Sequence, residues 1–315
     1  MEFQVEIAGG LFKALDAALK GTLGTGTGRV MVGLGASFGS MWMLNFTIKS
    51  IYWLHQGMDA IFQEVVWSII RVAVIVYFAF NVGWYISTIV PIVTGLPDWM
   101  GGVLSGHEGP ATNQVDSLIN SYISSLDTLV STMKFGWTED WSVMFYAILV
   151  IIFYLMGGIP FLSVCVGTMI TLKVAMTVIL VVGPIFIAFA MFDQTKQWFW
   201  GWVSVLGAFM LTQVLFAVVV GLELNYINNY IVKNGEIETT LVTAFEILLV
   251  FGAFTLLATE LPNYAASIMG GTPSGGVGGV GGLLGKATGL TTARRLAGAG
   301  ARGIASRFKA RNRIN

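Results

Sequence analysis

The chain has 315 residues, of which 55% are hydrophobic and only 11% are charged, and its mean hydropathy is +0.76. Soluble domains carry about a quarter charged residues, so this composition excludes an ordinary soluble globular protein. The formal net charge is zero, but residues 286–315 hold 8 of the 17 basic side chains and no acid. The remainder of the chain is therefore acidic overall.

The first part of the chain predicts a short amphipathic helix followed by a hinge. Apolar residues four apart over residues 3–19 leave the charged side chains on other faces, a pattern typical of a helix that lies on a membrane or a partner. Glu2 and Glu6, with no basic start, do not fit a cleaved secretory signal, so we expect internal helices to drive insertion. The glycine-rich residues 21–28 indicate a flexible hinge. We therefore treat residues 1–29 as an extramembrane unit.

Residues 30–90 predict the first two membrane helices, over residues 30–48 and 72–90. Each segment is apolar for about the 20 residues that a helix needs to cross a bilayer. Gly35 and Gly39 form a GxxxG pair in the first of them, and such a pair lets a neighbouring helix approach closely. Packing within one subunit and contact between subunits explain this pair equally well.

Residues 91–140 predict a periplasmic loop, because they carry six acidic residues and only Lys134 as a base. Within this loop, the apolar residues of segment 115–133 fall on one face of a helix. That face needs a cover, and we expect another protein to provide it; lying flat on lipid is the alternative. The residues predicted to make this contact are Ile119, Tyr122 and Leu126.

Residues 141–262 predict the remaining membrane helices. The stretch 143–192 contains a single charged residue, Lys173, and is long enough for two crossings. We expect a break between them near residues 157–160 or around Gly167. A charged lysine is costly in the bilayer, so we place Lys173 at the turn between the two helices; a polar protein interior is the other possibility.

Two more apolar segments follow, over residues 198–222 and 241–261, with a polar loop at 223–240 between them. Glu246 falls about one turn inside the second segment, so we expect it at the membrane interface, with a carboxylate facing a lumen as the alternative. Residues 263–315 form a glycine-rich tether and a basic tail, and the positive charge predicts a cytoplasmic location for that tail.

The predicted fold is thus an all-α polytopic transmembrane protein with about five to six membrane helices, an amphipathic N-terminal helix and a periplasmic loop helix. Six crossings would put both ends of the chain on one side. The charges, however, place the connection 49–71 and the tail inside and the acidic loop outside, which requires an odd number. We therefore expect five full crossings, with a piece between residues 143 and 222 that turns back.

The sequence offers little that could carry catalysis. It contains no Walker motif, no GxGxxG in a strand-to-helix setting, no metal-ligand cluster and no nucleophile with a base beside it. We therefore expect no enzymatic activity and no cofactor or metal. The functions that remain are transport, channel formation and scaffolding.

One region resembles a known family. Gly-Pro-Ile-Phe-Ile-Ala at 183–188 is followed by Phe-Asp-Gln-Thr-Lys-Gln-Trp-Phe at 192–199 and by Trp-Gly-Trp at 200–202. This run resembles the signature region of the TrbL/VirB-six family, the polytopic inner-membrane subunit of bacterial conjugative type IV secretion systems. The layout of residues 1–265 is also similar to that family. The signature residues are Gly183, Pro184, Phe192, Thr195, Trp198 and Trp202.

The resemblance implies a multi-pass subunit of the bacterial inner membrane that forms homo-oligomers at the base of a conjugation machine. It implies a role in pilus assembly and a place on the route of transferred single-stranded DNA and protein. The implied partners are the major and minor pilins, inner-membrane scaffold proteins, cytoplasmic ATPases and membrane lipids. It gives no role to Lys173 or Glu246. A secondary transporter or permease, and a membrane anchor without a conduit, are the alternatives.

Overall fold

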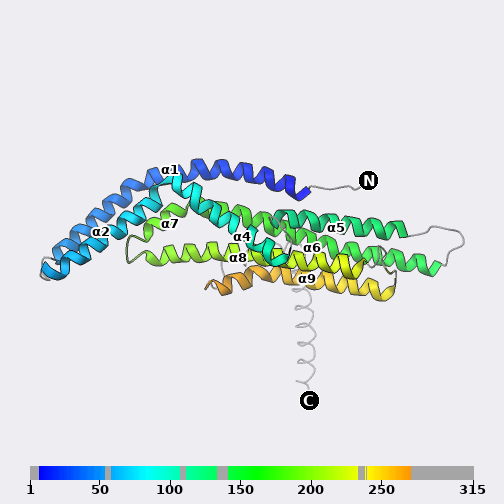
Figure 1. Ribbon diagram of the computed structural model, residues 1–315. Coiled ribbons are helices and arrows are strands. Elements are labelled where there is room, and N and C mark those ends of the chain that lie inside the picture. The colour runs from blue at the N-terminus through cyan, green and yellow to red at the C-terminus, as the bar shows by residue number, and fades with distance from the viewer. Residues whose placement is uncertain are drawn as a thin grey trace, which may run out of the picture.

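The structure is a computed structural model, and every element in the part that it describes is a helix. The prediction of an all-α polytopic protein is therefore confirmed. Figure 1 shows an elongated molecule in which long helices run side by side along one direction. The described residues are 7–53, 58–106, 111–132, 141–232, 238 and 240–270.

The first two helices, α1 (Ile7–Trp53) and α2 (Met58–Phe80), form an antiparallel hairpin that extends beyond the other helices (Figure 1). The expected hinge at 21–28 and the separate helix at 30–48 are both wrong, because the two segments belong to the single helix α1. Packing against α5 (Ala111–Thr132), α6 (Trp141–Val181) and α7 (Gly183–Phe189) outweighs the poor helix propensity of the glycines. The buried side chains along this stretch are Leu23, Thr27, Met31 and Phe38.

The chain is interrupted directly after α2. Asn81 has an extended conformation, and its side chain accepts a hydrogen bond from the Trp84 backbone N–H at 3.0 Å, which caps the short helix α3 (Val82–Trp84). A π-helical turn, η1 (Tyr85–Ile89), then leads into α4 (Val90–Ser105). The continuous helix expected over 72–90 is therefore wrong.

The segment expected to be a periplasmic loop folds onto the apolar helices instead. Its described residues form α4 and α5 (Ala111–Thr132), and α5 confirms the amphipathic helix predicted at 115–133. Helix α4 lies against α8 (Lys196–Tyr226), because Gly101 brings the backbone of α4 close to Ala217. The acidic segment is therefore largely helical in its described part, and its location on the periplasmic side stays a prediction.

The long apolar block forms one 41-residue helix, α6 (Trp141–Val181), followed by the short α7 (Gly183–Phe189). The break expected near residues 157–160 or Gly167 is wrong. Gly157 and Gly158 serve close packing rather than a turn: a Cβ at Gly157 would lie 2.9 Å from Cβ of Phe251, and one at Gly158 would overlap the ring of Tyr122. Lys173 consequently lies within a continuous helix and at no turn.

Helix α8 (Lys196–Tyr226) continues through a π-helical turn, η2 (Ile227–Ile231), before the chain returns along α9 (Leu241–Ile268). The polar loop expected from residue 223 therefore begins nine residues later. Helix α9 packs along both α6 and α8, and these three helices with α4 and α5 form the bundle. Figure 1 shows α6, α8 and α9 side by side.

Among the described residues, four helices are long and apolar enough to cross a membrane, by length and composition. We expected five or six. The difference arises because α1, which contains residues 30–48, has no stretch apolar enough to count as a span, and because the 143–192 block supplies one long helix rather than two. The four candidate spans are Phe62–Phe80, Met144–Val181, Lys196–Ile231 and Leu241–Ile268.

Candidate functional site

The signature residues converge where α6 gives way to α7. Pro184 has no backbone N–H, so the carbonyl of Leu180 loses the donor that an uninterrupted helix would supply. The hydroxyl of Tyr85 replaces it and donates to this carbonyl at 2.8 Å. Nε1–H of Trp202 donates to the neighbouring carbonyl of Ile179 at 3.1 Å. Two side chains from distant parts of the sequence thus donate hydrogen bonds to the carbonyl groups at the end of α6. We call the region around Gly183 and Pro184, with Tyr85 and Trp202, the Gly-Pro junction.

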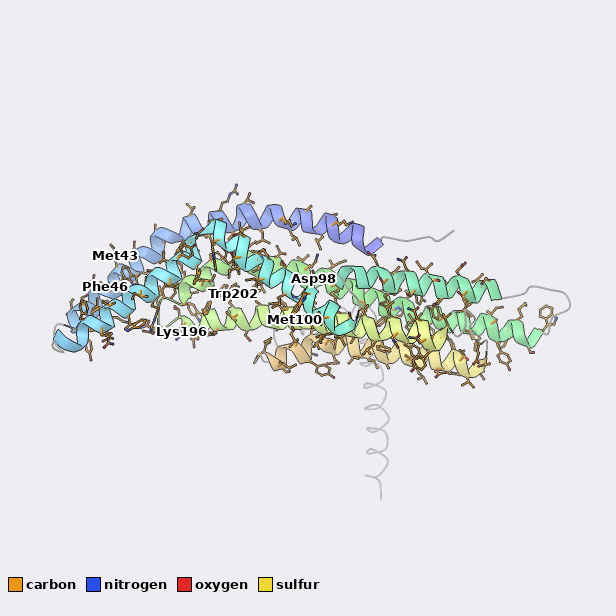
Figure 2. The ribbon with its side chains drawn as sticks, viewed as in Figure 1. Met43, Phe46, Asp98, Met100, Lys196 and Trp202 are labelled. Carbon is orange, nitrogen blue, oxygen red and sulfur yellow. The ribbon has the colours of Figure 1, made fainter. Side chains whose placement is uncertain are left out.

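Glycine is required at position 183 for steric reasons. A Cβ there would overlap the hydroxyl of Tyr85 and would lie 2.8 Å from Cζ2 of Trp202. The indole of Trp202 also stacks on Phe186, with ring centroids 6.3 Å apart. In Figure 2, Trp202 and Lys196 mark the first part of α8, beside α7. The Gly-Pro pair and Trp202 therefore act together, although 18 positions separate them in the sequence.

The turn between α7 and α8 contains the other signature residues. The hydroxyl of Thr195 donates to the carbonyl of Phe189 at 2.8 Å, which closes the turn. Trp198 contacts the ring of Phe189 edge to face at 4.8 Å. Phe38, which is 6% exposed, reaches from α1 to Phe189 at 5.4 Å and to Phe192 at 6.3 Å. These rings attach the hairpin to the Gly-Pro junction.

Opposite charges join the same elements. Asp193, in the turn before α8, lies 3.5 Å from Nζ of Lys49 on α1 and 3.9 Å from a guanidinium nitrogen of Arg71 on α2. All three side chains are substantially exposed, so each pair contributes at most about 1 kcal/mol. These ion pairs help to fix the position of the hairpin on the bundle, because the single carboxylate of Asp193 contacts both α1 and α2.

An apolar groove of about 560 Å³ lies between α1 and α2. The predicted GxxxG residues line it. A Cβ at Gly35 would make only an ordinary contact with Phe80 at 3.7 Å, and one at Gly39 would have no atom within 4 Å. The pair therefore does not hold two helices of this chain in close contact. Other residues that line the groove are Met31, Phe38, Trp42, Val72, Ala73 and Met191.

The structure covers the apolar stripe of α5 with the chain itself. Ile119 and Tyr122 are 9% and 5% exposed, and Leu126 is half-buried. Tyr122 stacks on Tyr154 of α6 at 4.5 Å, and each hydroxyl donates to the backbone carbonyl of the other residue, at 2.9 and 3.3 Å. The contact expected with a partner at these three residues is thus an internal contact, because α6 and α8 fill the space that a partner would take.

The two polar residues expected in the membrane lie in different settings. Lys173 is half-buried on α6, and Glu246 is exposed on α9. The structure does not bring them together with the Gly-Pro junction. Within the described ranges, no three His, Cys, Asp or Glu side chains are close enough to hold a metal ion.

Sequence reasoning missed two residues. Tyr85 falls near the end of the helix predicted over residues 72–90, whereas the structure buries it at the Gly-Pro junction. Glu223 was assigned to the start of a loop, but it lies in α8 and is fully buried. Extending the helical pattern of residues 198–222 by two turns would have placed Glu223 on a buried face of the helix, where a carboxylate is unusual.

The fold and the Gly-Pro junction define the class of this protein: a polytopic helical membrane protein with an interrupted helix near one end of its bundle. A comparison with curated protein sequences gives no match. The profile of the TrbL/VirB6 plasmid conjugal transfer protein family matches residues 42–261, which include the whole of α2, the whole Gly-Pro junction and most of α9. The chain belongs to this family, and it is therefore a component of conjugal transfer, that is, of type IV secretion.

Proposed function

We propose that this protein is an inner-membrane subunit of the conjugation machine, several copies of which form part of the translocation route and the platform for pilus assembly. The family match over residues 42–261 carries the proposal. The Gly-Pro junction supports it, because it fixes an exposed apolar hairpin on a packed bundle. We expect the major and minor pilins, inner-membrane scaffold proteins and cytoplasmic ATPases as partners, with single-stranded DNA passing transiently.

Four crossings suit the charge pattern better than five. If α1 does not cross, the basic residues before Phe62 and the basic tail lie on the same side, and residues 81–143 lie on the other. The first two regions would be cytoplasmic and the acidic one periplasmic, as the distribution of positive charge favours. The ion pair of Asp193 with Lys49 supports this arrangement, because it puts both of these groups at the cytoplasmic side.

Reporter fusions test this orientation. Alkaline phosphatase is active only outside the cytoplasm, so we expect activity after Gly109 and none after Asn315. A fusion after Asp193 is the matched control and should be inactive as well. Activity at Asn315 or at Asp193 would contradict four crossings in this orientation.

Self-assembly is supported by the surface of the hairpin. Met43 is 68% exposed, Leu44 is 65% exposed and Trp67 is 62% exposed, and the apolar groove lies beside them. Figure 2 shows Met43 and Phe46 on the part of α1 that extends past the beginning of α8. A helix from a second copy would cover part of this surface, and lipid would cover the rest.

The decisive experiment is complementation of a donor strain that lacks this chain. We expect DNA transfer and pilus formation to be lost and to return with the wild-type chain. Copurification from detergent should then recover more than one copy together with secretion subunits. Normal transfer without the chain would contradict the proposal and would favour the alternative of a secondary transporter or permease.

A further inference from the structure

The most unusual side chain of the bundle is Glu223 on α8. The residue has 0% exposure, and neither carboxyl oxygen has a hydrogen-bond partner among the described residues. Buried carboxylates are normally paired with a cation or with several N–H groups, because an isolated charge in an apolar interior is strongly disfavoured. Neither the Gly-Pro junction nor the groove uses this residue.

The groups around Glu223 cannot neutralise a carboxylate. Helix α8 packs against α4, α5, α6 and α9. The cation of α6, Lys173, lies eight residues past Cys165, which is about 12 Å along a helix. The titratable side chains that interact with Glu223 are Tyr154 and Cys165 of α6 and Tyr226 of α8, none of which carries a positive charge. On the other helices, Tyr122 of α5 stacks on Tyr154, Glu246 of α9 interacts with Tyr226, and Asp98 of α4 bonds Gln213, ten residues before Glu223.

The ligand that fits this site is small. Tyr154, Cys165 and Tyr226 are close enough to Glu223 to interact with it electrostatically, and the carboxyl is enclosed by side chains. Ca²⁺ and Mg²⁺ need about six oxygen ligands, which these neighbours do not supply, and no three His, Cys, Asp or Glu side chains of the described residues could hold another metal ion. A proton needs no cavity and removes the charge that the site cannot accommodate.

We propose that Glu223 is a proton-binding site, held as the neutral carboxylic acid in the closed bundle, and that loss of this proton loosens the contact between α8 and α6. The ionised carboxylate requires water, and water can reach it only if the helices separate. Because the closed bundle binds the proton more tightly than the loosened one, raising the pH favours the loosened state.

The only cysteine of the chain reports on this change. Cys165 is fully buried on α6 and interacts with Glu223, so loosening exposes the thiol. The test measures alkylation of Cys165 by N-ethylmaleimide in membranes that contain the full chain. The variants are Glu223→Gln, which mimics the neutral acid, and Glu246→Gln, which removes an exposed acid from α9.

We expect the wild type and Glu223→Gln to react equally slowly at about pH 6. At pH values above the titration of Glu223, the alkylation rate of the wild type should rise relative to that of Glu223→Gln by up to about tenfold per pH unit. The thiol's own titration affects both proteins alike, so the ratio isolates Glu223. Glu246→Gln should behave as the wild type.

Equal rates for the wild type and Glu223→Gln at every pH would overturn the proposal, as would a loss of the pH effect in Glu246→Gln.

Thermal unfolding in detergent is the second measurement. Glu223→Gln should unfold at the same temperature as the wild type at about pH 6 and at a higher temperature at about pH 9. A lower unfolding temperature at both would mean that the site needs the carboxylate and would also overturn the proposal.

Discussion

The bundle and the hairpin are both made of apolar helices, but they are buried to very different extents. In the candidate span of α8, 56% of the residues are buried inside the protein, whereas the corresponding share for α2 is 11%. In the bundle, glycines allow side chains of neighbouring helices to interlock; in the hairpin, glycines line an open groove. The comparison teaches that helices of similar hydropathy can form a closely packed core, as in the bundle, or an exposed surface for lipid or other copies, as in the hairpin.

The largest effect is expected in the bundle, at Gly158. Gly158→Ala places a Cβ within the ring of Tyr122, and neither α5 nor α6 can move without breaking the two hydroxyl-to-carbonyl bonds between them. We expect a loss of about 3 kcal/mol in the free energy of unfolding, measured by denaturant titration in mixed micelles.

The matched control is Gly252→Ala on α9, where the new Cβ would meet no atom within 4 Å. This change should be neutral or should stabilise the protein by up to about 1 kcal/mol, because alanine favours helix more than glycine does. Equal effects of the two substitutions would show that the close approach of Tyr122 does not limit packing.

The next effect is expected at the Gly-Pro junction, which links the two regions. Gly183→Ala should cost about 2 kcal/mol, because the new methyl displaces the Tyr85 hydroxyl and leaves the carbonyl of Leu180 without its donor. Tyr85→Phe should cost about 1 kcal/mol by itself. The double variant should be less destabilised than the sum of the two, since phenylalanine lacks the atom that clashes.

A double-mutant cycle of unfolding free energies measures this coupling. Gly201→Ala is the control, because a Cβ there meets nothing within 4 Å. Strict additivity of Gly183→Ala and Tyr85→Phe would contradict the proposed role of the hydroxyl.

In the hairpin we expect function and stability to separate. Gly39→Leu projects into the groove, where its Cβ meets no atom within 4 Å, so the free energy of unfolding should change by no more than about 0.5 kcal/mol. DNA transfer should nevertheless fall, because the side chain occupies space proposed for another copy. The measurement is transfer frequency alongside the amount of protein in the membrane. Normal transfer by a stably inserted variant would remove the groove from the assembly surface.

A small effect that depends on salt is expected for Asp193→Asn, which removes both ion pairs of the hairpin. The groups are exposed, so the loss should be about 1 kcal/mol or less and should vanish in high salt. Unfolding at two salt concentrations tests this, with Glu260→Asn on α9 as a control for the loss of a negative charge. A larger loss that does not depend on salt would mean that Asp193 acts through the turn rather than through charge.

The sequence by itself determined the class of the protein and its family. Apolar length and low charge require a membrane, because no soluble core could bury so much surface, and the amphipathic period of α5 follows from local spacing alone. The run from Gly183 to Trp202 carried the family resemblance, and the match over residues 42–261 confirms it.

Only the tertiary structure decided where the helices break and which residues meet. Glycine and proline indicate that a helix can break, but neighbouring side chains decide whether it does: Gly157 and Gly158 remain helical because rings pack on them, whereas Pro184 breaks α6 because Tyr85 and Trp202 satisfy the freed carbonyls. Such donors come from segments distant in sequence. For the same reason, Glu223 could be recognised as buried only once α8 had its neighbours.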